Sequence, residues 1–298
     1  MSQPRRIVLH VGLPKTATSS LQLWCDRKRE RLAARGVSYP KEWASDLFPK
    51  HQFLVGGLLS GDLRRLAAVL AAEEAGTVLL SAEGLTNHLY DFPPPALEAF
   101  RAATAADEVA VFMVSRAPAS WTRSYYKQAV LNPPRPEYDY ATALDYEAFR
   151  ERPRVRRLTD LPALRRDLEA AYGAREVVVA AYEDDWMAAF RGVLGLADTV
   201  GFEPLAQVHT SVPDAVIALV RRLNAMQLPE QARADFLALV QAAVDTDHNA
   251  LKHFYRAESA AALRGEGNRA ILRRLRAEAA GPDAILAAIE AFVGGPPR

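Results

Sequence analysis

The chain has very little cysteine: Cys25 is the only one among 298 residues. An internal disulfide needs two cysteines, and a single thiol is typical of proteins in a reducing compartment. The N-terminal Met-Ser-Gln-Pro-Arg-Arg leads into only five residues of apolar type, which is too short for a signal peptide. No stretch approaches the ~18 apolar residues that a membrane span requires. We therefore expect a soluble, cytoplasmic protein without a membrane span.

An excess of one charge is also missing. The 37 basic and 36 acidic residues leave a formal net charge of +1, which argues against a general nucleic-acid or anionic-membrane binder. Only six of the basic residues are lysines, so a lysine in a polar loop is more informative here than a cluster of arginines. Half of the residues are hydrophobic and 24% are charged, which predicts a sizeable core rather than disorder.

Strand-like runs alternate with helical patterns, which predicts an α/β fold: a three-layer parallel sheet covered by helices. We expect strands at residues 7–11, 37–39, 77–81, 109–115 and 176–181. Helical patterns at 62–75, 95–106 and 161–172 precede the last three strands. Ligands of such sheets bind outside the carboxyl ends of the strands, so the segments that follow the strands are the places to look for a site.

From about residue 211 the strand-like runs give way to helical patterns. Four are expected, at Pro213–Met226, Pro229–Val244, Asn268–Ala280 and Pro282–Val293. No glycine- or serine-rich linker and no repeat separates them from the rest. The sequence therefore predicts an α/β core over residues 1–210 and a helical cap over 211–298 that packs on it, in a single compact domain overall.

The most informative stretch is residues 7–21, Ile-Val-Leu-His-Val-Gly-Leu-Pro-Lys-Thr-Ala-Thr-Ser-Ser-Leu. A buried strand is followed by a tight turn, one lysine, four hydroxyl residues and the start of an amphipathic helix. The free N–H groups of a helix N-terminus, a lysine and several hydroxyl donors together form an anion site. The alternative is an ordinary strand-to-helix turn in which the hydroxyls only cap the helix. Capping would not need the lysine as well.

The spacing does not fit a Walker loop, because Gly12 is only three residues before Lys15 and Pro14 takes the place of the second glycine. The loop resembles instead the 5′-phosphosulfate loop of sulfotransferases that use 3′-phosphoadenosine 5′-phosphosulfate (PAPS), which typically reads Pro-Lys-[Ser/Thr]-Gly-Thr-[Thr/Ser]. This chain matches that pattern at every position except Ala17, where the family has glycine. Because alanine disfavours a positive φ, we expect Ala17 to be right-handed helical or extended. The resemblance implies a P-loop-like anion site formed by Pro14, Lys15, Thr16, Ala17, Thr18, Ser19 and Ser20.

A second motif follows the strand at 109–115. Arg116 ends this strand and Ser124 lies eight residues further on, which resembles the 3′-phosphate motif of the same family. A guanidinium grips phosphate bidentately and a hydroxyl donates one more bond. A third stretch, Val177–Asp184, resembles the strand ending in Tyr/Phe-Glu-Asp that occurs late in these enzymes. The resemblance covers roughly residues 7–200, and the Arg-Lys-Gly loop of cytosolic members is not found.

The resemblance to PAPS-dependent sulfotransferases implies transfer of a sulfuryl group from PAPS to a hydroxyl acceptor, without a metal, leaving 3′-phosphoadenosine 5′-phosphate. Lys15 would stabilise the leaving oxygen. The acceptor hydroxyl needs a base, and Glu83 resembles the glutamate of carbohydrate sulfotransferases, with His88 and His51 as alternatives. We expect a carbohydrate or a small hydroxylated metabolite as the acceptor.

Two other functions remain open from the residues. A nucleotide-dependent kinase with a variant phosphate loop would need an acidic Mg²⁺ site at a strand end, whereas the strand at 109–115 is followed by Arg116. A non-catalytic protein of the same fold would bind a nucleotide or a partner without turnover. Lys15, Arg116 and Ser124 are all present, which argues against a protein that has lost its catalytic residues.

Overall fold

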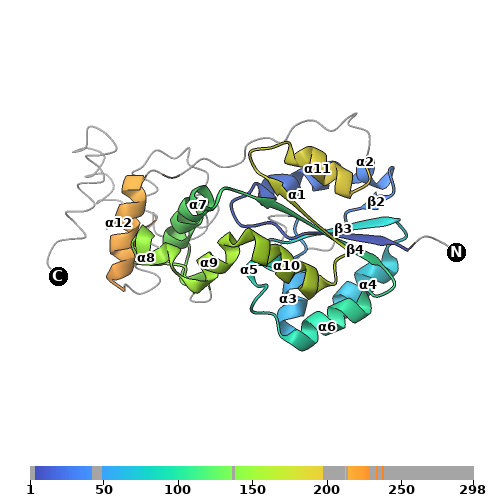
Figure 1. Cartoon of the computed structure of the whole chain (residues 1–298), viewed down its shortest axis with the longest axis horizontal. Helices are drawn as coiled ribbons and strands as arrows, with labels where there is room; N and C mark the ends of the chain where they lie inside the picture. Colours follow the sequence, from blue (N-terminus) through green and yellow to red (C-terminus); the bar gives the residue numbers. More distant parts are fainter. Residues whose placement is uncertain are drawn as a thin grey trace, which may run out of the picture. The chain divides into compact units, whose positions relative to one another are not determined.

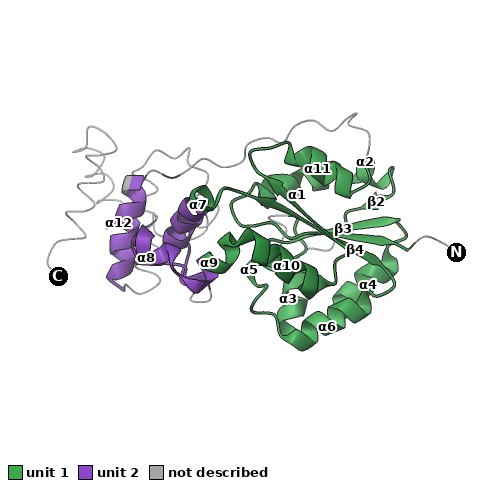
Figure 2. Cartoon of the chain, viewed as in Figure 1, with its two compact units in different colours: residues 1–121, 156–206 green, residues 122–155, 207–298 purple. Residues whose placement is uncertain are grey.

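The computed structural model describes residues 4–41, 49–135, 138–196, 212, 214–227, 233 and 237. It divides into two compact units, drawn in different colours in Figure 2. The first contains residues 1–121 and 156–206, and the second contains residues 122–155 and 207–298. The division differs from the boundary expected near residue 210, because residues 122–155 group with the C-terminal residues and not with the α/β core.

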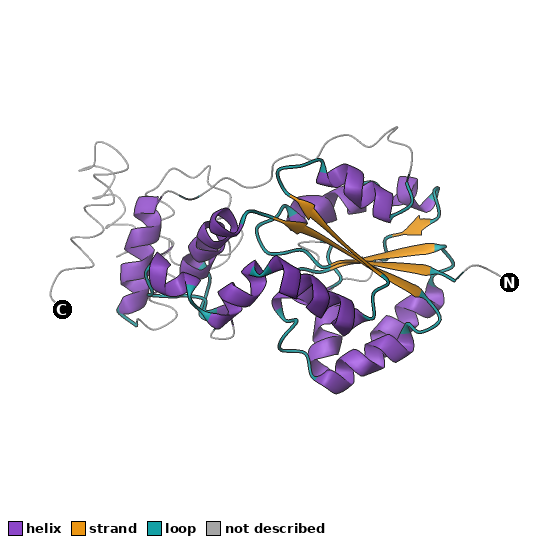
Figure 3. Ribbon diagram, viewed as in Figure 1, coloured by secondary structure: helices purple, strands orange, loops and turns teal. Residues whose placement is uncertain are grey.

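The first unit contains a five-stranded sheet in the order β2-β3-β1-β4-β5, in which every pair is parallel (Figure 3). The strands are β1 (Arg6–His10), β2 (Val37–Ser38), β3 (Thr77–Ser81), β4 (Glu108–Ser115) and β5 (Glu176–Ala181). The predicted α/β class is confirmed. The bounds of β3 and β5 are as predicted, β2 and β4 differ from the prediction by one residue at one end, and β1 begins and ends one residue earlier than predicted. Parallel strands read as near-continuous apolar runs because both faces are buried.

Helices cover both faces of this sheet (Figure 1). On one face lie α1 (Thr18–Arg27), α2 (Arg29–Ala33) and α11 (Trp186–Val193). On the other lie α3 (Gln52–Ser60), α4 (Arg64–Ala72), α6 (Pro94–Ala103) and α10 (Leu161–Tyr172), with the short α5 (Gly84–Asn87) after β3. The bounds of α10 are as predicted, and Gly173 ends it with a left-handed φ of 61°. Helices α4 and α6 are shorter than the patterns suggested.

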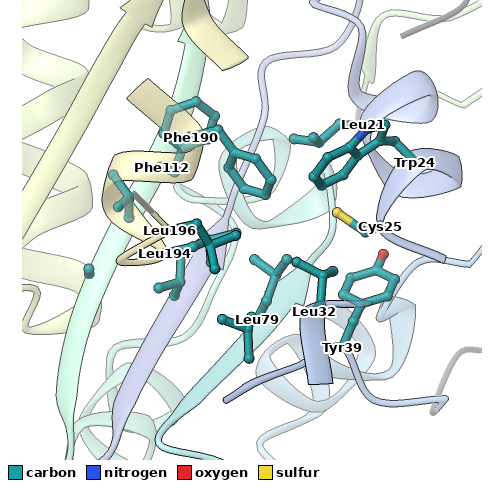
Figure 4. Close-up of a cluster of buried hydrophobic side chains, with 14 of the residues drawn as sticks. Leu21, Trp24, Cys25, Leu32, Tyr39, Leu79, Phe112, Phe190, Leu194 and Leu196 are labelled. Atoms are coloured by element: carbon teal, nitrogen blue, oxygen red, sulfur yellow. The ribbon is translucent and has the colours of Figure 1, made fainter. Parts of the chain in front are cut away.

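An aromatic cluster holds α1 and α11 on their face of the sheet (Figure 4). The Trp24 ring meets the Phe190 ring edge-on at 6.2 Å between centroids, and Phe190 lies 5.1 Å from Phe112 of β4. Cys25 is buried in the same cluster, and burial raises the pKa of its thiol. The single cysteine is therefore a packing residue, and the cluster packs α1 and α11 against β1 and β4.

The second unit is helical in its described part. It contains most of α7 (Pro118–Leu131), α8 (Tyr146–Arg150) and α12 (Asp214–Ala225), while α9 (Pro153–Thr159) crosses its boundary. The buried Asn224 of α12 donates hydrogen bonds to the carbonyls of Val130 and Thr142, both at 2.9 Å. These bonds join the C-terminal residues to 122–155, and they explain why that segment leaves the α/β core.

Helix α12 lies within the range expected at Pro213–Met226. Of the three later helices predicted, only residues 233 and 237 belong to the described part of the chain. The expected packing of 211–298 on the core stays a prediction. Throughout the described residues, every helix is too short or too polar to reach across a bilayer.

Candidate functional site

Three candidate segments leave the same edge of the sheet. His10, the last residue of β1, is in register with Ser81 of β3 and with Phe112 of β4. From β1 the chain goes on to β2 and β3 on one side and reaches β4 on the other, so the order of the strands reverses at β1. In open α/β sheets the crevice outside such a reversal is the usual ligand site.

The turn after β1 depends on Gly12. A Cβ at this position would lie 2.2 Å from Cγ2 of Thr18, and φ is +33°. Only glycine therefore allows the first turn of α1 to pack so closely on the end of the strand. Helix α1 consequently begins directly beside the loop, with its free N–H groups at the sheet edge.

The loop backbone is left-handed at two positions, Lys15 (φ 68°) and Ala17 (φ 60°), while the φ of Thr16 between them is not positive. Such alternation turns successive N–H groups toward one concave side, which is how backbone nests bind anions. The expectation that Ala17 is right-handed or extended was wrong. Ala17 is the N-cap of α1, and its carbonyl accepts the bond from the N–H of Leu21 at 3.0 Å. A left-handed alanine costs roughly 1–2 kcal/mol, which the surrounding packing offsets.

The hydroxyl groups of the loop divide into two kinds. Thr16 Oγ1 donates to the carbonyl of Leu13 at 2.7 Å, and the hydroxyl of Thr18 donates to the carboxylate of Glu83. Those two hydroxyl protons are already used within the protein. Ser19 and Ser20 form no side-chain hydrogen bond within the part of the chain that is described, so their donors remain for a ligand.

The loop is tied to the start of α7. The indole Nε1 of Trp121 donates to the carbonyl of Pro14 at 2.8 Å, and both residues are buried. The sequence analysis did not single out Trp121. A tryptophan inside the second motif, five residues after Arg116, was the signal that could have suggested it.

Lys15 is the centre of a charged group. Burial lowers the pKa of Lys15, the carboxylate of Glu83 raises it, and the guanidinium of Arg116 lowers it. These three residues, which the sequence placed after three different strands, therefore lie within electrostatic reach of one another. Neither Lys15 nor Arg116 forms a hydrogen bond or ion pair with any residue in the described ranges. Two cations without a described ion pair, at one edge of a sheet, favour an anionic ligand.

Arg116 is held by an aromatic ring. Its guanidinium carbon lies 5.2 Å from the ring centroid of Tyr182, the residue that follows β5. This cation–π contact positions the side chain without satisfying its donors. The Nε of Arg116 is buried and has no hydrogen-bond partner in the described structure. The Tyr-Glu-Asp stretch noted in the sequence thus contributes its tyrosine to the site.

Among the three candidate bases, Glu83 is the one whose charge acts on Lys15. His51 is buried, and its ring is used within the core: Nδ1 accepts from the N–H of Ser81 at 2.9 Å and Nε2 donates to the carbonyl of Pro40 at 2.9 Å. His88 is also mostly buried, and its Nδ1 lies 3.1 Å from Oδ2 of Asp91. The geometry therefore favours Glu83 over the two histidines.

His10 is a residue of the site that sequence reasoning missed. It is buried, its Nδ1 lies 2.7 Å from Oγ of Ser81, and burial lowers its pKa to about 3, so the ring is neutral. Its Nε2 has no partner among the described residues and would lie 3.3 Å from a Cβ at Gly12. The signal was a polar residue at the end of an aliphatic strand, directly before the loop.

Ser124 lies on α7, half-buried, in the part of that helix that belongs to the second unit. Its expected pairing with Arg116 therefore stays a prediction. In the described ranges, His, Cys, Asp and Glu side chains form no group of three or more that could hold a metal ion. Comparisons with protein-family models, with curated proteins and with solved structures gave no match.

Proposed function

We propose that this chain is a PAPS-dependent sulfotransferase that acts on a hydroxyl acceptor, a carbohydrate or a small hydroxylated metabolite. One observation carries the proposal: Lys15, in a left-handed loop between β1 and α1, lies near Arg116 at the end of β4, and neither cation forms a hydrogen bond or ion pair with a described residue. A loop of this form fits the phosphosulfate end of the donor, and Arg116 fits its second phosphate.

The reaction assigns a role to each group. The backbone N–H groups from Thr16 to Ser20 and the ammonium of Lys15 bind the 5′ end of the donor, and Arg116 binds the 3′-phosphate. The carboxylate of Glu83 takes the proton of the acceptor hydroxyl while the acceptor oxygen bonds to sulfur. The bond from sulfur to the bridging oxygen breaks, and Lys15 stabilises the charge that this oxygen gains.

One observation favours a second candidate, a kinase that uses a magnesium nucleotide. Thr18, in the first turn of α1, donates a hydrogen bond to Glu83. A hydroxyl and a carboxylate next to a phosphate loop also suit a hydrated Mg²⁺ ion. A third candidate is a protein that binds the nucleotide without turnover.

Thermal unfolding separates the first two candidates, because a ligand that binds only the folded state raises the melting temperature. We expect 3′-phosphoadenosine 5′-phosphate alone to stabilise the protein. The shift should be lost in Lys15→Ala and kept in Lys28→Ala, which removes the same charge at the other end of α1. A shift given only by ATP with Mg²⁺ would favour the kinase, and no shift with either nucleotide would contradict both enzymes.

The direct test is transfer of labelled sulfate from PAPS to a panel of glycans, small hydroxylated metabolites and phenols. We expect a labelled product with at least one member of the panel and none with Lys15→Ala. Normal turnover by Lys15→Ala would refute the assignment. Binding of 3′-phosphoadenosine 5′-phosphate without any transfer would identify the non-catalytic protein.

A further inference from the structure

The second unit contains a pocket of its own. Side chains of α7, α8 and α12 line a cavity of about 310 Å³, a size at the lower end of small-molecule sites. Four of its lining residues are charged: Arg123, Lys127, Asp214 and Arg221. None of them has a role in the proposed sulfuryl transfer, so the inference drawn from this pocket is independent of that function.

The charges of the pocket do not cancel. The ammonium of Lys127 lies 2.7 Å from Oδ1 of Asp214 and donates to the carbonyl of Val212 at 2.7 Å. The lysine and the one carboxylate therefore neutralise each other. Arg123 and Arg221 form no ion pair with a carboxylate in the described ranges. The pocket thus has an excess of two positive charges, both on planar groups that suit oxyanions.

Aromatic rings position both arginines. The guanidinium carbon of Arg123 lies 5.9 Å from the ring centroid of Tyr146, and the Tyr146 ring meets Tyr126 edge-on at 5.7 Å. Tyr126 forms a hydrogen bond with Arg221 and donates its own proton to the carbonyl of Leu144 at 2.9 Å. Since these bonds occupy the phenol oxygen of Tyr126, its ring offers the pocket mainly apolar surface.

An apolar wall completes the pocket. Ile217 and Ala218 of α12 line it together with the two tyrosine rings. Figure 1 shows α12 next to α7 and α8 in this unit. Cations at one part of a cavity and rings with an aliphatic wall at another match a ligand with an anionic head and a flat apolar body.

We infer that this pocket binds a small organic anion in which a planar ring carries a phosphate or a sulfate ester. The guanidiniums of Arg123 and Arg221 hold the tetrahedral oxyanion, and the ring lies against Tyr126, Tyr146 and Ile217. Phosphate and sulfate esters share this chemistry, and they differ in charge. The affinities of the two esters therefore show which one the pocket prefers.

Isothermal titration calorimetry of the full chain tests the inference with 4-nitrophenyl phosphate and 4-nitrophenyl sulfate. Two control probes are titrated alongside: inorganic phosphate, which lacks the ring, and 4-nitrophenol, which lacks the ester. We expect at least one ester to bind about tenfold or more tightly than either of these two probes, because each part of the ligand contributes. Titrations of Lys15→Ala should give the same affinity, which shows that the loop after β1 is not the site measured.

Single variants locate the binding. Arg123→Gln and Arg221→Gln should each weaken ester binding about tenfold, since each removes a charged donor. Arg222→Gln is the matched control: it is the exposed neighbour of Arg221 on α12 and does not line the pocket. Equal loss in Arg222→Gln, or equal affinity for 4-nitrophenol and the esters, would overturn the inference. Melting curves of each variant confirm that it is folded.

Discussion

The hydroxyl of Thr18 donates a hydrogen bond to the carboxylate of Glu83, and this contact joins the first turn of α1 to the segment after β3. It holds Glu83 near Lys15, where the carboxylate would have to lie in order to serve as a base for an acceptor hydroxyl. The same contact also stabilises the fold. The two roles of Glu83 are separable, because a hydrogen bond needs only an oxygen acceptor whereas a base needs a group that takes a proton.

Glu83→Gln should lower the rate of sulfuryl transfer by about 10²- to 10⁴-fold, since an amide cannot act as a general base. The amide oxygen still accepts the bond from Thr18, so the melting temperature should change little. Binding of 3′-phosphoadenosine 5′-phosphate should be kept. The readouts are the pH–rate profile and the melting curve. An unchanged profile in the variant would exclude Glu83 as the base.

Thr18→Val is the complementary variant, since it removes the hydroxyl and keeps the branched shape of the side chain. It should cost about 1.5–3 kcal/mol of stability, the range for a hydrogen bond to a charged group. Its loss of activity should be far smaller than that of Glu83→Gln. Denaturant unfolding and initial rates measure the two effects. A greater activity loss in Thr18→Val would assign the chemistry to the threonine instead.

The buried position of Lys15 predicts a pH dependence of donor binding. Burial lowers the pKa of Lys15 below its ordinary value of 10.5, and only the protonated amine attracts an anion. Affinity for 3′-phosphoadenosine 5′-phosphate should therefore fall as the pH rises through that lowered pKa. In Lys15→Arg the guanidinium stays charged throughout this range, so the alkaline loss should disappear. Calorimetric titrations at a series of pH values measure both proteins, and an identical alkaline loss in each would contradict the role of Lys15.

Much of the fold was predictable because the inner strands β1, β3 and β4 are buried on both faces and appear as apolar runs. The bounds of β3, β5 and α10 agree with those expected from the sequence. The division into units was less predictable. It depends on tertiary hydrogen bonds such as those from Asn224 to the carbonyls of Val130 and Thr142, which leave no periodic signal in the sequence.

The candidate site was predictable to a similar degree. Lys15, Glu83 and Arg116 were identifiable as chemical groups that follow strands, and the parallel topology brings them together. The conformation of Ala17 was not, since propensity disfavours it and only packing around the loop makes it tolerable. The contact of Arg116 with Tyr182 was not predictable either, because parallel order brings the ends of β4 and β5 together without showing which side chains meet there.

Gly12→Ala should destabilise the protein by about 2–4 kcal/mol, because it adds a strained φ and a steric overlap with Thr18. Adding Thr18→Ser should recover the share of the lost stability that is due to the steric overlap. Serine lacks Cγ2 and keeps the oxygen that bonds Glu83. Gly36→Ala is the control: φ is +75° there and a Cβ would meet nothing within 4 Å. Denaturant unfolding gives the free energies, and equal losses in Gly12→Ala and Gly36→Ala would contradict the close packing.

His10 predicts how stability responds to acid. Its folded-state pKa of about 3 lies below the ordinary value of 6.5, so the unfolded chain binds a proton that the folded protein rejects. The titration of His10 does not change stability above pH 6.5. It lowers the free energy of unfolding as the pH falls from there toward 3, by up to about 1.4 kcal/mol per pH unit. In His10→Asn the amide takes the place of Nδ1 next to Ser81 and does not titrate, so the free energy of unfolding should fall less steeply over that window. Because the carboxylates titrate in both proteins, the difference between the two slopes isolates His10. Parallel slopes would show that the ring accepts a proton in the folded state.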